Sequence, residues 1–235
     1  MSRPVFLIAG TFLLLIAGPA AAMGNADPLL AMLRVDKLEV AVDEDPTPQR
    51  FEAKGWLGYD LNKLWLKSEV EREGSETESA DLELLYGRAI SPYWDAQVGW
   101  KRDFEPGPKQ DWLAIALHGL APYFFEVDSS LYLADGGRSS LSFMAEYELL
   151  FTQKWILSPE LEFDLNGYND EVTGAGSGLS KLELGLRLRY EIRREFAPYI
   201  GLHWERLYGN TADFARADGH DTDSLQFVVG LRAWF

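Results

Sequence analysis

Residues 181–192 read KLELGLRLRYEI. Leucine occupies every second position from 182 to 188, and Tyr190 and Ile192 continue the series. The intervening positions hold Glu, Gly, Arg, Arg and Glu. A period of two places the two series on opposite faces of a β-strand. The segment therefore predicts a strand of about twelve residues with one apolar and one charged face.

The same alternation recurs in residues 140–151, 155–166 and 224–235. Strands of soluble sandwiches average about 5–6 residues and turn an apolar face inward. Runs of about 10–12 residues match a tilted strand that crosses a bilayer. We therefore predict an all-β fold, a transmembrane antiparallel up-and-down β-barrel with lipid outside and a wet lumen. The terminal sequence RAWF, residues 232–235, is typical of bacterial outer-membrane barrels.

The composition excludes several other classes of protein. The 235 residues contain no Cys, which excludes a disulfide scaffold, a Cys-ligated zinc site and thiol catalysis. The net charge of −15 argues against nucleic acid as a partner, since phosphate binding needs Lys and Arg. Aromatic residues make up 13% of the chain, as expected for the aromatic girdles of a barrel.

The first 22 residues, MSRPVFLIAGTFLLLIAGPAAA, have the pattern of a secretory signal peptide. Arg3 is followed by an apolar run and then by small residues at 20–22. An inner-membrane anchor is the alternative, but the run is shorter than the ~20 residues of a spanning helix. We expect a short periplasmic lead-in at 23–31 and the barrel at 32–235.

Connection lengths predict about twelve strands. Short turns near 60–62, 90–92, 120–122, 152–154 and 194–196 alternate with longer polar connections, as periplasmic turns and external loops do. Eleven strands are read directly, and the segment 33–42 completes an even number. The register of that segment is ambiguous at Asp36 and Lys37, so a ten-stranded barrel is the alternative.

Several stretches are more specific than barrel alternation alone. They are GWLGYDLNKLWLK (55–67), LYGRAISPYWD (85–95), GLAPYFFE (119–126), GSGL (176–179), GLRLRYEIRREFAPY (185–199) and GLRAWF (230–235). Together they resemble the copper resistance protein B family of the outer membrane, from about residue 32 to the end. The resemblance implies copper as the transported or bound ion without a tightly bound cofactor, and a periplasmic multicopper oxidase as partner. The Met- and His-rich N-terminal segment of many members is missing here.

The inward faces of the predicted strands are rich in carboxylates. A lumen with an excess of one charge concentrates the opposite ion, and rings of Asp and Glu select cations. The alternative is a solvated lumen in which internal ion pairs neutralise these charges. The predicted acidic lumen consists of Glu69, Glu71, Asp81, Glu83, Asp95, Glu126, Asp128, Glu148, Glu160, Glu162, Asp164, Glu183 and Glu191.

Imidazole suits Cu²⁺, and thioether suits Cu⁺. Five residues that face inward are the candidate metal ligands: His118, Met144, Glu146, His203 and Glu205. His220, in an acidic loop, is more simply explained as solvated. We expect no enzyme. A hydrolase that uses His203 and Glu205 is an alternative, but it needs a serine from a neighbouring strand, and Ser224 is expected near the opposite end of the final strand. A further alternative is a structural or docking barrel without ion flux.

Overall fold

The computed structural model describes residues 27–42 and 47–235. Strands make up most of this chain. They are β1 (Leu30–Ala41), β2 (Pro48–Gly58), β3 (Asn62–Glu73), β4 (Glu76–Ser91), β5 (Trp94–Glu105), β6 (Gln110–Ala121), β7 (Phe125–Leu133), β8 (Ser139–Glu146), β9 (Leu149–Leu150), β10 (Trp155–Asn166), β11 (Gly178–Tyr190), β12 (Phe196–Leu207) and β13 (Asp223–Trp234). The helices are the 3₁₀ turns η2 (Pro122–Phe124) and η3 (Asp135–Gly137) and the α-helix α1 (Gly209–Asp218). None of these helices is long and apolar enough to cross a membrane.

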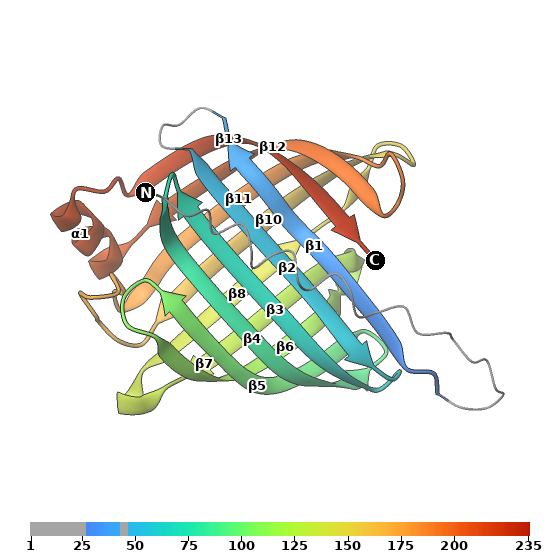
Figure 1. Ribbon diagram of the computed structural model, residues 1–235, viewed down its shortest axis with the longest axis horizontal. Coiled ribbons are helices and arrows are strands. Elements are labelled where there is room, and N and C mark those ends of the chain that lie inside the picture. Colours follow the sequence, from blue (N-terminus) through green and yellow to red (C-terminus); the bar gives the residue numbers. More distant parts are fainter. Residues whose placement is uncertain (1–26, 43–46) are drawn as a thin grey trace, which may run out of the picture.

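Each strand pairs antiparallel with its neighbours, and β1 pairs with β13 to close the sheet into a barrel (Figure 1). The last residue takes part in the closure. Phe235 N donates to Leu33 O at 2.8 Å, and Leu33 N donates to Phe235 O at 3.0 Å. Closure satisfies the backbone groups of both edge strands, as a barrel in lipid requires.

The wall contains twelve strands, because β8 and β9 are two parts of one strand. Both pair with β10, and the interruption at Tyr147 and Glu148 stands opposite Pro159. Proline has no N–H to donate to a neighbouring strand. The prediction of twelve strands is confirmed, and the ten-stranded alternative is wrong.

A bulge in β1 explains the ambiguous register of the first strand. The pairing with β2 shifts between Val35 and Lys37. An extra residue on one strand lets consecutive side chains point to the same side. Asp36 and Lys37 accordingly both make ion pairs inside the barrel. The strand begins at Leu30, within the segment expected as lead-in, and the predicted signal peptide at 1–22 lies outside the described residues.

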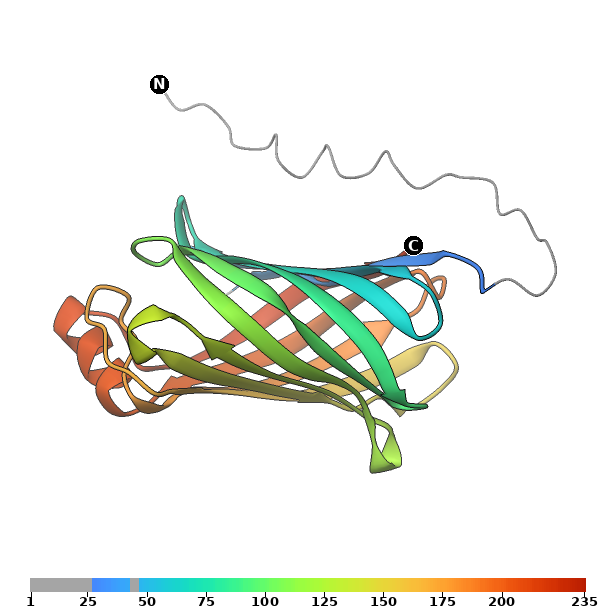
Figure 2. The same ribbon diagram turned by 90° about the horizontal axis from the view of Figure 1, so that it is seen from below.

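The strands run obliquely along the barrel, and the connections at its two ends differ in length (Figures 1 and 2). One end carries the longest connections, 167–177 and the α1-containing 208–222, and we call it the loop end. The other end carries short turns and the C-terminus, and we call it the turn end. Strands of this length, tilted in this way, span the hydrocarbon layer of a bilayer.

The alternating pattern separates an apolar outside from a charged inside. On β11, Leu184 and Leu186 are 45% and 41% exposed on the outer face, whereas Arg187 and Arg189 are buried in the lumen. The outer face is apolar along the other strands as well, as at Leu113 and Ile115 of β6. A cluster of buried apolar side chains also lies inside the barrel, where Trp65, Leu85, Trp112 and Tyr132 pack together.

Candidate functional site: an acidic lumen in three parts

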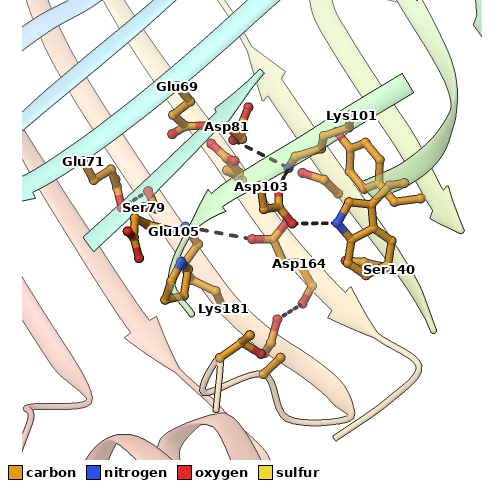
Figure 3. A pocket seen from close by; sticks show the side chains of 18 of the residues that line it. Glu69, Glu71, Ser79, Asp81, Lys101, Asp103, Glu105, Ser140, Asp164 and Lys181 are labelled. Atoms are coloured by element: carbon orange, nitrogen blue, oxygen red, sulfur yellow. Dashed lines mark hydrogen bonds and ion pairs between the residues drawn. The ribbon is translucent and has the colours of Figure 1, made fainter. Parts of the chain in front are cut away.

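A chamber of about 530 Å³ occupies the loop-end half of the lumen, and we call it the loop-end chamber (Figure 3). Twelve carboxylates line it against six lysines and arginines. The carboxylates are Glu52, Glu69, Glu71, Glu78, Asp81, Glu83, Asp103, Glu105, Asp128, Glu162, Asp164 and Glu205. The formal excess is six negative charges. Such a chamber attracts cations and repels anions.

Some of these carboxylates are already paired. Lys101 Nζ lies between Asp81 and Asp103, at 3.6 and 3.4 Å (Figure 3). Glu69 and Glu162 are not paired in this way. No Lys or Arg nitrogen of the described chain lies within 4.0 Å of either carboxylate. The chamber therefore keeps carboxylates whose charge no protein cation contacts directly.

A layer of ion pairs fills the middle of the lumen, and we call it the ion-pair layer. Arg187 donates to Glu39 at 2.9 and 3.0 Å and to Glu160 at 3.1 Å. Lys37 Nζ lies 3.0 Å from both Glu160 and Glu52. The remaining space in this layer is about 30 Å³, room for on the order of two water molecules.

The ion-pair layer continues toward the turn end through a second set of pairs. Arg232 lies 3.4 Å from Asp36 and 3.2 Å from Glu146, and Arg34 lies 2.6 Å from Asp36. Arg189 Nη2 lies 2.5 Å from Glu148. Glu146 and Glu148, both predicted to face the lumen, are therefore partners of arginines here.

A wider space of about 740 Å³ opens at the turn end, and we call it the turn-end chamber. Its lining includes Asp95 and His118. Lys63 Nζ pairs with Asp95 at 3.1 Å. The ring of Trp65 packs edge-on against His118, with centroids 5.3 Å apart. Arg34 of the ion-pair layer also lines this chamber, whereas Lys37 and Glu52 of the same layer line the loop-end chamber.

The remaining predicted acidic residues lie mostly on the lumen wall. Glu126 pairs with Arg34 and Lys54, at 2.7 and 3.2 Å. Glu83 accepts a hydrogen bond from the Tyr132 hydroxyl at 2.5 Å, and Glu71 contacts Arg50. Glu191 lies past the end of β11, at the turn end.

Two of the five predicted metal ligands come together. One ligand atom each from Glu183, His203 and Glu205 lies within 4.8 Å of the others. His203 is 1% exposed, and neither ring nitrogen has a hydrogen-bond partner among the described residues, although Nε2 lies 3.5 Å from Glu183. An imidazole beside two carboxylates is a donor set that suits Cu²⁺. Both carboxylates of this group also have a cationic partner. Lys181 lies 2.5 Å from Glu183, and Arg50 lies 3.4 Å from Glu205.

The other three predicted ligands do not join that group. Met144 lies on β8, two strands away from Glu183, and Glu146 belongs to the ion-pair layer. His118 lines the turn-end chamber, with Nδ1 3.4 Å from Asp128 Oδ2. In the sheet, β10 and β11 separate His203 and Glu205 on β12 from Met144 and Glu146 on β8.

The hydrolase alternative placed Ser224 far from His203 and Glu205. That placement is wrong, since Ser224 stands directly opposite Glu205 across β12 and β13. His203 stands opposite Gln226 instead. Its ring accepts no hydrogen bond from a hydroxyl of the described chain, so the structure does not contain the serine–histidine contact that a nucleophile needs.

Sequence reasoning missed the lumen residues of the first two strands. Asp36, Lys37, Glu39 and Arg50 all form ion pairs in the lumen. The signal was the pair Asp36–Lys37, which breaks the alternation and marks the bulge. A charged pair in an otherwise alternating strand indicates such an extra residue.

A closed barrel of twelve membrane-length strands, with an apolar outer face and a charged lumen, defines the class of outer-membrane β-barrel proteins. The solved NanC porin has this fold as well. The two chains superpose with a TM-score of 0.56 at 10% identity, over 87% of this chain and 99% of the porin.

The model of the family described as copper resistance protein B precursor (CopB) matches residues 29–235. Copper resistance protein B of Escherichia coli is 42% identical over 204 residues, which cover 87% of this chain and 69% of the relative. A copper resistance protein B homolog of Pseudomonas syringae pv. tomato is 44% identical over 200 residues, which cover 85% and 68%. The chain belongs to the copper resistance protein B family. The predicted family and the predicted outer-membrane location are confirmed, and the loop end is the end that faces outward.

Proposed function

We propose that this barrel passes copper ions across the outer membrane through its acidic lumen. The observation that carries the proposal is the loop-end chamber itself, with twelve carboxylates against six cationic side chains. A divalent ion gains twice the electrostatic energy of a monovalent one in the same field. A periplasmic multicopper oxidase, implied by the family resemblance, is the proposed partner at the turn end.

Within the lumen we assign copper binding to Glu183, His203 and Glu205. Glu205 lines the loop-end chamber, and His203 lies buried beside it. An unpartnered buried imidazole is costly unless a ligand uses it. A bound Cu²⁺ would satisfy one ring nitrogen and weaken the hold of Lys181 on Glu183. The set is small and partly occupied by protein cations, which favours exchange over tight storage.

A second candidate function rests on the ion-pair layer. Its residual space of about 30 Å³ is too small for a hydrated copper ion, so the barrel as described is closed at its middle. A closed barrel would bind copper at the loop-end chamber or dock a periplasmic protein without ion flux. Flux and binding measurements separate the two functions.

The test of passage uses the purified protein in liposomes that contain a copper-quenched dye. We expect Cu²⁺ influx above that of protein-free liposomes, and little chloride flux through the same preparation. Equal influx with and without the protein would refute passage. Zn²⁺ run in parallel shows whether charge alone selects, because carboxylates bind both metals.

The test of binding uses electron paramagnetic resonance of Cu²⁺ added to the purified protein. We expect nitrogen coupling from one imidazole, lost in His203→Gln. The matched control is His220→Gln, because His220 is exposed in the connection after α1. Loss of the nitrogen signal in the control and not in His203→Gln would refute the assignment.

A further inference from the structure

One cross-strand row of the lumen wall consists almost entirely of metal-ligating side chains. Residues directly opposite each other in adjacent strands form the row. From β5 to β12 they are Asp95, His118, Asp128, Met144, Glu162, Glu183 and Glu205. Directly opposed residues share a face of the sheet, with Cα atoms about 4.5–5.5 Å apart. The row is therefore continuous, with no strand skipped.

The row climbs along the barrel and does not close as a ring. The strands of a barrel are tilted to the barrel axis. A row that runs perpendicular to the strands is therefore oblique to that axis. Asp95 is the second residue of β5, next to the turn end, whereas Glu205 lies near the loop end of β12. The residues that line the two chambers show the same climb from the turn end to the loop end. Asp95 and His118 line the turn-end chamber, and Glu162 and Glu205 line the loop-end chamber.

The row passes from one chamber to the other at a single contact. His118 lines the turn-end chamber and Asp128 lines the loop-end chamber, and His118 Nδ1 lies 3.4 Å from Asp128 Oδ2. That nitrogen has no hydrogen-bond partner among the described residues. The wall therefore carries ligands past the ion-pair layer, whose arginines are on β1, β11 and β13.

Lysines pair with three of the seven members of the row. Lys63 pairs with Asp95 at 3.1 Å, Lys67 with Asp128 at 2.7 Å and Lys181 with Glu183 at 2.5 Å. Each ammonium stands where a bound cation would stand and balances the buried carboxylate. A lysine side chain is flexible and can swing away when a metal ion takes its place.

We propose that this row is the path of copper through the barrel, with the ion passed from ligand to ligand and each lysine displaced in turn. The inference rests on the proposed function and adds the route to it. A path of discrete ligands differs from a uniform acidic field, because in a field every lumen carboxylate contributes according to its charge alone. The two descriptions predict different effects for carboxylates in the same chamber.

Glu69 and Glu162 provide the matched comparison. Both line the loop-end chamber, and neither has a Lys or Arg nitrogen of the described chain within 4.0 Å. Only Glu162 belongs to the row. We expect Glu162→Gln to lower Cu²⁺ influx about fivefold, which corresponds to about 1 kcal/mol in a barrier. Glu69→Gln removes the same charge and is expected to change influx less than about twofold.

A second variant leaves every carboxylate in place. The chain contains no Cys, so Met144→Cys introduces a single thiol on the row. A cationic methanethiosulfonate reagent added to this variant is expected to block Cu²⁺ influx. Ser79→Cys is the control and is expected to keep its influx, because Ser79 lines the same chamber beside Glu71 but is off the row. Potassium conductance in planar bilayers reports whether each variant is folded and open.

The outcomes separate the path from the proposed function. Absence of Cu²⁺ influx through the unaltered protein would overturn both. Influx that falls equally in Glu69→Gln and Glu162→Gln, or a block at Ser79→Cys but not at Met144→Cys, would overturn the path and leave copper passage standing. A selective effect at Glu162 and Met144 supports the path.

Discussion

Arg187 of β11 holds the carboxylate of Glu39 on β1 through two hydrogen bonds, at 2.9 and 3.0 Å. The two strands are separated in the sheet by β12 and β13. The Tyr199 hydroxyl donates to the same carboxylate at 3.0 Å. Glu39 is 3% and Arg187 6% exposed, so the pair is a buried clamp across the lumen rather than a surface ion pair. These hydrogen bonds link β1 to β11 across the lumen.

Removal of Arg187 is expected to destabilise the barrel strongly. Arg187→Met leaves Glu39 buried without its main partner, which costs about 3–5 kcal/mol for a buried pair that is broken on one side. The measurement is the urea midpoint of unfolding from lipid vesicles. Arg216→Met is the control, because Arg216 pairs only with exposed Asp213 in α1 and should change the midpoint little.

The double variant Arg187→Met/Glu39→Gln tests the cause of that loss. With no buried carboxylate left unpaired, it should recover part of the stability lost by Arg187→Met alone. A double variant less stable than the single one would show that packing, not charge, explains the loss.

The turn-end part of the ion-pair layer is expected to control conductance. Arg232→Ser removes a cation and leaves Asp36 and Glu146 facing the lumen, so cation conductance should rise and chloride permeability should fall. Glu146→Gln should do the opposite, because it frees the charge of Arg232. Single-channel recordings in planar bilayers measure both. A change of the same sign in the two variants would contradict an electrostatic origin.

Salt is expected to weaken copper entry through the acidic chamber. The Debye length falls from about 30 Å at 0.01 M to about 10 Å at 0.1 M, so the field of the loop-end chamber reaches less far. Initial Cu²⁺ influx at fixed copper concentration should therefore fall as sodium perchlorate is added. An influx that does not depend on ionic strength would indicate that copper enters through local ligation without attraction by the field.

The sequence predicted the barrel, its strand number and most of its inward face, because a period of two is a local property that a strand keeps along its length. Leu184 and Arg187 face outward and inward as the pattern requires. The pattern failed where an extra residue interrupts it, at Asp36 and Lys37. No rule of alternation could assign both residues to the lumen.

The candidate site was predicted only in its parts. Glu205 and His203 are close in sequence, so their common face was foreseeable. Glu183 completes their group because of the register between β11 and β12, which depends on turn geometry and side-chain packing along both strands. The ion-pair partners of Glu146 and Glu148 lie 41 to 86 residues away in the chain, and only the closed barrel brings them together.

Gly230 is expected to be sensitive to the smallest side chain. It stands opposite Tyr199 across β12 and β13, and a Cβ at Gly230 would lie 2.5 Å from both Cζ and the hydroxyl oxygen of that ring. The ring cannot move freely because its hydroxyl is bonded to Glu39. Gly230→Ala should therefore cost about 1–3 kcal/mol through overpacking, measured by the same urea titration. In a Tyr199→Val background the glycine change should cost much less, since the ring is gone. An equal cost in both backgrounds would assign the effect of Gly230 to its backbone instead of to the contact with Tyr199.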